Sequence, residues 1–112
     1  MMSSLTDDTR WLDATAQAEL VASGKVTPLE MVNAAIERVE RYDGALNALT
    51  YRWFEAAREL ASSNTLPDGP FRGVPYLLKD LYAAEAGKPL SNGSKAYKAA
   101  DYVSSEDTTL VS

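Results

Sequence analysis

A short apolar run between a glycine and a lysine constrains the fold of this chain more than any other feature. Residues 71–81 read FRGVPYLLKDL, in which the run Val74–Leu78 follows Gly73 and ends at the charged residues Lys79 and Asp80. A run this short that ends in charge is typical of a buried strand rather than a helix, and a proline is tolerated near a strand's start. Because helical patterns precede it, we expect an α/β layered fold with a lysine at the end of a strand.

Residues 1–12 form a polar lead, and the first helix is predicted directly after it. Asp13 can cap a helix over residues 14–23, because its carboxylate can accept a hydrogen bond from a free backbone N–H of the first turn. Gly24 then offers the left-handed conformation with which helices commonly end. The alanine-rich segment DATAQAELVASG is therefore expected to form one short helix.

The second helix has a stronger start signal. Thr27 supplies a capping hydroxyl, Pro28 suits the first helical position, and Glu30 can close a capping box. The sequence predicts a helix from Pro28 to about Tyr42. Apolar residues recur along it at three- and four-residue steps and form one stripe, which needs a partner surface. This apolar stripe consists of Leu29, Val32, Ile36 and Val39.

Three further secondary-structure elements and one loop are expected. Residues Ala45–Tyr51 could form a short strand, and the segment Ser62–Pro70 has the composition of a loop. The last residues resemble a helix start, since Ser104 and Ser105 are followed by acidic residues, yet the chain ends soon afterwards. A third helix is predicted between the first strand and the loop from the spacing of Trp53, Phe54, Ala57, Leu60 and Ala61.

The chain of 112 residues is thus interpreted as the N-terminal part of a single, apparently truncated domain. Its expected divisions are a lead (1–12), a helical region with a short strand (13–70), the lysine-bearing strand (71–82), and a loop with the start of a further helix (83–112). One isolated turn of helix is not stable, which favours an element that continues beyond the given residues.

Composition excludes several classes of function. With 11 basic and 16 acidic residues the net charge is −5, and no basic cluster could neutralise a row of phosphates, so nucleic acid is not expected as a partner. No apolar stretch approaches the ~20 residues that a membrane-spanning helix needs, and the start lacks a secretory leader pattern, so we expect a cytoplasmic protein without membrane contact. The hydrophobic share of 46% is ordinary for a packed core.

The chemistry available to the chain is limited, because it contains no cysteine and no histidine. It therefore lacks the usual zinc ligands, a thiol nucleophile and the commonest general base, and we expect neither a metal nor a cofactor. Lys79 is the candidate catalytic residue, since burial at the end of a strand disfavours the charged amine and lets it act as a base. Asp80 would oppose this, but adjacent side chains on an extended backbone point to opposite faces.

The motif GVPYLLKD resembles the lysine motif of the amidase signature family, and the likeness extends over nearly the whole chain. The helix pair, the segment FEAAR, the lead GPFRGVP and the later AGKPLSNGS all have counterparts in that family. The resemblance implies a mixed-sheet α/β/α fold, of which this chain would hold the N-terminal helices and first strands. General amidases fit better than the subunit that amidates misacylated transfer RNA, because Leu81 follows Asp80 where that subunit usually has asparagine.

The resemblance also implies a mechanism. Members of the family hydrolyse carboxamide bonds, other than peptide bonds, with a nucleophilic serine, a second serine and a lysine that acts as base through the second serine. Only the lysine, Lys79, can be placed here, so the chain alone is expected to be inactive. The stretch Ser91 to Ser94 lacks the family's Gly-Ser-Ser-Gly-Gly pattern and matches a turn after the lysine, so Ser94 is interpreted as a turn residue rather than a nucleophile. Tyr82 could line a substrate entrance.

The expected partners are a small-molecule amide substrate and either a second copy of the chain or the missing C-terminal remainder. Two other hypotheses stay open. The chain could be a noncatalytic helical module that docks the apolar stripe on a partner protein, or a truncated relic with no present function.

Overall fold

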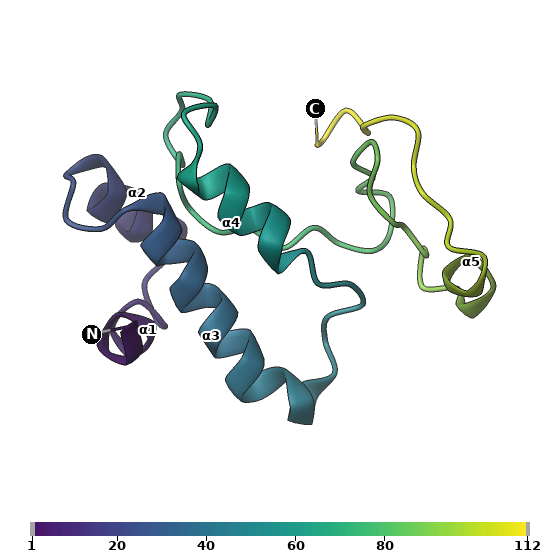
Figure 1. The fold of residues 1–112 in the computed structure, drawn as a ribbon, viewed down its shortest axis with the longest axis horizontal. Helices are drawn as coiled ribbons and strands as arrows, with labels where there is room; N and C mark the ends of the chain where they lie inside the picture. The colour runs from purple at the N-terminus through teal and green to yellow at the C-terminus, as the bar shows by residue number, and fades with distance from the viewer. Residues whose placement is uncertain (1, 112) are drawn as a thin grey trace. The chain divides into compact units, whose positions relative to one another are not determined.

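The computed structural model describes residues 2–111, so Met1 and Ser112, at the ends of the predicted lead and final element, lie outside it. The chain divides into two compact units, residues 1–75 and residues 76–112. The first unit contains α1 to α4 and the second contains α5 (Figure 1). No helix within residues 2–111 is long and apolar enough to span a membrane.

Helix α2, Ala14–Ala22, is confirmed as the sequence predicts it. The Asp13 carboxylate accepts a hydrogen bond from the backbone N–H of Ala16 at 2.8 Å. Ser23 is the C-cap residue. Gly24 follows with a φ of 76°, a left-handed conformation that costs glycine little. Local capping chemistry alone therefore sets both ends of this helix.

Helix α3, Pro28–Leu46, begins as predicted and ends later than predicted. Its capping box is complete: Thr27 Oγ1 accepts from the Glu30 N–H at 3.1 Å, and Glu30 Oε1 accepts from the Thr27 N–H at 3.0 Å. The helix continues past Tyr42 because Asn47, with a φ of 50°, supplies the left-handed cap only at that point. The strand expected over residues 45–51 is wrong, since the helix occupies its first two positions.

Helix α1, Met2–Asp8, lies in the segment interpreted from the sequence as a lead. Polar side chains of α3 form hydrogen bonds with this helix and with Thr9, which directly follows it. Thr6 Oγ1 donates to Glu37 Oε2 at 2.8 Å, and Arg38 Nη1 donates to the Thr6 carbonyl at 3.0 Å and to Thr9 Oγ1 at 2.9 Å. Thr6 and Thr9 are buried, so these bonds satisfy polar groups whose burial without a partner would cost free energy. A helix held by polar contacts shows no apolar periodicity in its sequence, so α1 was not predicted.

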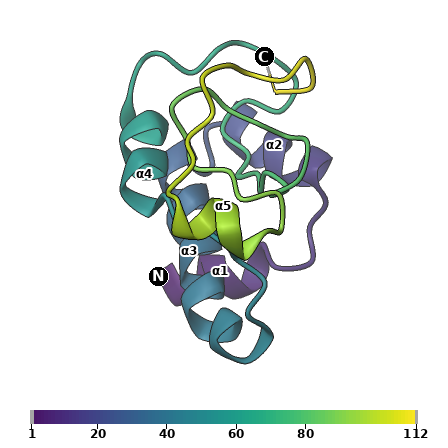
Figure 2. The ribbon, with the colours of Figure 1, turned by 90° about the vertical axis from the view of Figure 1, so that its right-hand side faces the viewer.

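Helix α4, Phe54–Ser62, is confirmed and packs against α3 (Figures 1 and 2). Of the apolar stripe on α3, Ile36 is buried and the other three members are half-buried. The stripe is therefore covered in part within its own unit. The core of this unit also contains residues outside the stripe, and its buried apolar members are Ala18, Val26, Met31, Ala34 and Ile36.

The second unit contains one short helix, α5, Lys95–Ala99, which the sequence analysis did not predict. Its backbone pairing includes an isolated antiparallel bridge between Pro89 and Val103. Beside the bridge, the Leu90 N–H donates to the Tyr102 carbonyl at 3.1 Å and the Ser104 N–H donates to the Lys88 carbonyl at 3.1 Å. Buried residues of this unit are Ala83, Ala84, Ser91 and Ser104.

The final predicted element is also wrong. The helix start expected from Ser104 onward is a series of bends and turns in the described residues. Ser104 Oγ donates to the Glu106 carbonyl at 2.8 Å, and Asp107 Oδ1 accepts from the Ala86 N–H at 2.8 Å. These side chains bond to nearby loops instead of capping a helix, which is the usual competition for serine and aspartate.

The lysine-bearing strand expected within residues 71–82 is not formed. Residues 74–79 have no regular secondary structure, and Tyr76 and Leu77 are 78% and 71% exposed. Among residues 2–111 the structure contains no strand beyond the bridge described above, so the mixed sheet is not seen. An apolar run makes a strand only where neighbouring strands pair with it, and these residues have none beside them.

Candidate functional site

Lys79 lies at the surface of the second unit. Its side chain is exposed, so the burial predicted from the apolar run is wrong for this structure. Among the described residues, no carboxylate lies within ion-pair distance of it, including that of its neighbour Asp80. The amine is thus left available, but water surrounds it.

Asp80 forms hydrogen bonds with a loop instead of an ion pair with Lys79. Its carboxylate accepts a hydrogen bond from the backbone N–H of Ser91 at 2.7 Å and another from Ser91 Oγ. The backbone N–H groups of Asn92 and Gly93 also help to lower the pKa of this carboxyl group. One carboxylate therefore collects the donors of a loop that lies 11 residues further along the chain.

The loop is a tight turn whose conformation follows from its sequence. Asn92 and Gly93 have φ values of 50° and 72°, and the Ser94 N–H donates to the Ser91 carbonyl at 2.8 Å. Two successive left-handed residues closed by this bond are typical of a type I′ turn, for which Asn-Gly is a favoured pair. Such a turn directs successive N–H groups inward, where an anion can bind them.

These hydrogen bonds determine the ionisation of Asp80. Partial burial alone would raise the pKa of its carboxyl group, but the bond from Ser91 Oγ and those from the backbone of Ser91, Gly93 and Asn92 outweigh it, so the pKa lies below its usual value. The group is a carboxylate at neutral pH. A base with a lowered pKa is a weak acceptor of protons, so Asp80 is poorly suited to activate a hydroxyl.

The serines near Lys79 have structural positions. Ser91 is only 2% exposed and bonds to Asp80, so a substrate could not reach its hydroxyl. Ser94 closes the turn and precedes α5 as its N-cap residue, which agrees with its interpretation as a turn residue. Tyr82 is 80% exposed, and its N–H donates to Asn92 Oδ1 at 3.4 Å. The Asp80–turn contact was missed because the sequence analysis placed Asp80 only in relation to Lys79.

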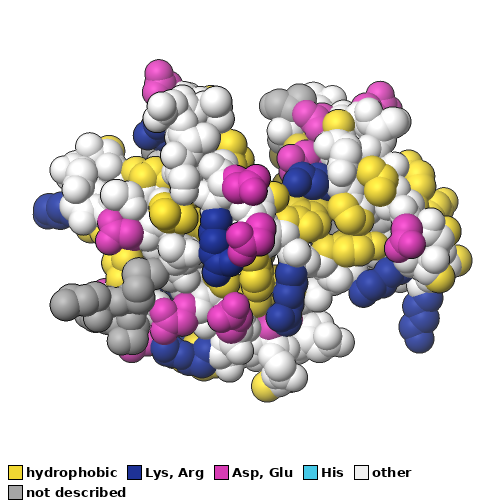
Figure 3. All heavy atoms as spheres, viewed as in Figure 1, with side chains coloured by type: hydrophobic (Ala, Val, Ile, Leu, Met, Phe, Trp, Pro, Cys, Tyr) yellow, Lys and Arg dark blue, Asp and Glu magenta, His cyan; other side chains and the backbone are white. Residues whose placement is uncertain are grey.

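Within the described residues, no hydrogen bond or ion pair joins Lys79 to a second side chain. Within residues 2–111, no three acidic side chains come close enough together to hold a metal ion. The surface of the second unit does present many apolar side chains, which are visible on the right in Figure 3. The large apolar residues that are exposed in this unit are Tyr76, Leu77, Leu81, Tyr82, Tyr97, Tyr102, Val103 and Leu110.

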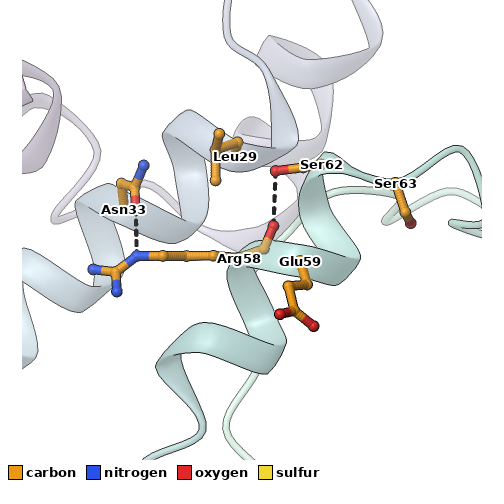
Figure 4. A pocket seen from close by; sticks show the side chains of 6 residues that line it. All are labelled: Leu29, Asn33, Arg58, Glu59, Ser62 and Ser63. Carbon is orange, nitrogen blue, oxygen red and sulfur yellow. Dashed lines mark hydrogen bonds between the residues drawn. The ribbon is translucent and has the colours of Figure 1, made fainter.

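The first unit has a shallow groove of about 520 Å³ between α3 and α4 (Figure 4). Arg58 Nε donates to Asn33 Oδ1 at 3.0 Å across it, and Ser62 Oγ donates to the Arg58 carbonyl at 2.8 Å. The first bond joins the two helices and the second lies within α4, and neither pairs a hydroxyl with a carboxylate as a nucleophile and its base would be paired. The residues that line it are Leu29, Asn33, Arg58, Glu59, Ser62 and Ser63.

Comparison with known proteins identifies the class. The sequence model of the Amidase family matches residues 30–112, a range that includes Lys79, Asp80 and the turn. The chain therefore belongs to the amidase family.

Individual relatives carry the comparison further. The chain is 41% identical, over 101 residues, to a 6-aminohexanoate-cyclic-dimer hydrolase of a Pseudomonas species, in a match that covers 90% of this chain and 20% of the relative. It is 36% identical over 93 residues to an acylamidase of Rhodococcus erythropolis, covering 76% and 19%. Identity to a subunit of the glutamyl-tRNA(Gln) amidotransferase of Renibacterium salmoninarum is 31% over 106 residues, covering 89% and 20%.

A solved structure agrees with this assignment. The structure of 6-aminohexanoate cyclic dimer hydrolase superimposes with a TM-score of 0.81 at 40% identity, over 90% of this chain and 20% of that one. The chain thus spans about a fifth of the length of the relatives it matches.

Proposed function

We propose that this chain supplies the catalytic lysine of an amidase-family hydrolase that cleaves carboxamide C–N bonds outside peptides. The observation that carries the proposal is the motif GVPYLLKD inside the region matched to the family. Two features of the structure support it: Lys79 forms no ion pair with Asp80, and Asp80 is occupied by the turn. The amine is therefore not held by its nearest carboxylate.

The proposed chemistry follows the family's Ser-Ser-Lys arrangement. A serine hydroxyl attacks the amide carbon while its proton passes through a second serine to the neutral Nζ of Lys79, and the proton later returns to the departing amine. Backbone N–H groups of a Gly/Ser-rich loop would stabilise the oxyanion. Neither serine nor that loop can be assigned to residues of this chain, so Lys79 alone gives no turnover.

The proposed fold in the active protein is the mixed-sheet α/β/α arrangement. The run Val74–Leu78 would pair with further strands there, and Tyr76 and Leu77 would lose their exposure. Burial of this run would also remove water from Lys79, which is the condition for a neutral amine near pH 7. The exposed apolar side chains of the second unit support this proposal, because a patch of this kind usually marks a surface that is covered.

The substrate class is a small-molecule amide. The relatives are named for a cyclic dimer of 6-aminohexanoate and for acyl amides, and both names describe amide bonds outside ordinary peptides. We extend only that shared chemistry to this chain.

Hydrolysis assays test the proposal. Residues 1–112 and the product of the complete gene would be assayed on a primary carboxamide, a chromogenic aryl amide and the cyclic dimer of 6-aminohexanoate. We expect no hydrolysis by residues 1–112, and hydrolysis by the complete product that Lys79→Ala reduces by at least about a thousandfold, as loss of a member of a catalytic triad does. Lys95→Ala, at an exposed lysine of α5, is the matched control and should keep full activity.

Two results would contradict the proposal. One is hydrolysis by residues 1–112 alone, which would mean that the two-serine mechanism is not needed. The other is a complete product that cleaves none of the amides, or cleaves them equally well after Lys79→Ala.

A further inference from the structure

The contact between Asp80 and the turn at residues 91–94 has a role that neither the family motif nor the helix packing explains. The geometry points to Asp80 as a positioning residue for Lys79, which fixes the lysine-bearing segment to this turn. The inference rests on the proposed function, because a position matters only if Lys79 takes part in the reaction.

The Asp80 carboxylate receives more than one hydrogen bond from the turn. Ser91 N–H and Ser91 Oγ both donate to its carboxylate. A carboxylate has about four acceptor positions and no donor, so it can accept both bonds at once. An amide of the same shape has one acceptor oxygen, and its NH₂ group would face other donors.

The contact between Asp80 and Ser91 is buried on the side of Ser91. Ser91 is almost fully buried, so a donor of this residue that loses Asp80 cannot turn to water instead. Leaving such a donor without a partner is more costly than the hydrogen bond itself is stabilising. The turn and the lysine-bearing segment are therefore strongly held together at this point.

The turn at residues 91–94 is stiff. Its two left-handed residues and the bond from Ser94 to Ser91 allow little freedom, and the Tyr82 N–H adds a second, longer link to Asn92. Asp80 and Tyr82 thus attach the segment on both sides of Leu81 to the same turn. Since Lys79 directly precedes the first attachment, the backbone from which it projects is fixed while its long side chain stays free.

The position of Lys79 affects catalysis because a base must lie close to the group from which it takes a proton. A base must reach its partner within hydrogen-bond distance, and misplacement by about 1 Å can cost a hundredfold in rate. If Asp80 acts only through Lys79, then removing Asp80 should have no effect once Lys79 is gone. This non-additivity separates a positioning role from a general loss of stability.

The test uses the product of the complete gene and a chromogenic aryl amide. We expect Asp80→Asn to lower kcat by about 10- to 100-fold with little change in KM. In the Lys79→Ala background, with methylamine added as a replacement base, Asp80→Asn should lower the rate no further. Asp101→Asn is the matched control, because Asp101 is exposed and its φ of 52° suits asparagine; it should leave kcat unchanged.

A second variant keeps the test decisive if Asp80→Asn does not fold. Ser91→Ala removes a single donor, so kcat should fall about 2- to 10-fold, again only when Lys79 is present. Equal losses with and without Lys79, or unchanged kcat for both variants, would overturn the positioning role. If Lys79→Ala itself has no effect, the proposed function fails instead, and the two failures can be told apart.

Discussion

At the scale of single residues, one carboxylate in each unit accepts hydrogen bonds from a neighbouring loop: buried Asp43 in the first unit and half-buried Asp80 in the second. Asp43, near the end of α3, is 5% exposed and accepts from the Ala48 N–H at 2.7 Å, the Leu49 N–H at 3.3 Å and Arg52 Nη2 at 2.7 Å. The bond from Ala48 and then the bond from Arg52 lower the pKa of Asp43 below its ordinary value, against the effect of burial. It thereby ends one helix and fixes the segment that leads to α4.

The charge on Asp43 should make the stability of the chain depend on pH. A lowered pKa in the folded state means that the stabilisation is fully present above the pKa of an unfolded aspartate, about 3.9, and is lost as the pH falls through the folded pKa. We therefore expect Asp43→Ala to lower the thermal unfolding midpoint at pH 7, and the difference from the unsubstituted chain to shrink below pH 4. Asp68→Asn, at an exposed loop position, serves as control. Equal differences at pH 7 and pH 3 would contradict the role of the charge.

At the scale of elements, the helices with local start signals could be predicted from the sequence. The caps at Asp13 and Thr27 use side chains within three residues of the groups they bind, so the pattern is visible in the chain itself. The later end of α3 depends on the left-handed cap at Asn47, which the sequence analysis did not anticipate. Helix α1 depends on contacts with distant residues of α3, and no local apolar pattern indicates it. The candidate lysine was found from its motif, but its exposure was not, because burial of a strand depends on neighbours that residues 2–111 do not provide.

The capping box of α3 gives a direct test of this distinction. Thr27→Ala removes the acceptor for the Glu30 N–H, and such a loss costs about 1 kcal/mol. We expect denaturant unfolding of the chain to show this loss with an unchanged dependence on denaturant concentration. Thr15→Ala, at an exposed position within α2, should cause no loss, since alanine favours a helix interior. A loss of similar size for both variants would mean that the cap is not the cause.

At the scale of the whole molecule, the two units differ in how well their apolar residues are covered. The first unit buries Met31, Ala34 and Ile36 against its own helices, whereas the second leaves Tyr76 and Leu77 largely in water. The chain matches relatives about five times its length, and the solved structure superimposes on 90% of it. The fold of the matched part of an amidase is therefore present, whereas the buried surroundings that would let Lys79 act as a base remain our proposal.

Leu77 tests whether those surroundings exist in the product of the complete gene. In residues 1–112 its side chain is 71% exposed, so Leu77→Asn should leave the unfolding midpoint unchanged and reduce self-association. In the complete product, where we propose that residues 74–78 form a buried strand, the same change should cost about 2–5 kcal/mol, as truncation of a buried leucine does. Ala84→Asn is the matched control, because Ala84 is buried in residues 1–112 and its substitution should destabilise both proteins. If Leu77→Asn leaves the complete product as stable as before, the run stays exposed there, Lys79 stays in water, and the proposed sheet does not form around it.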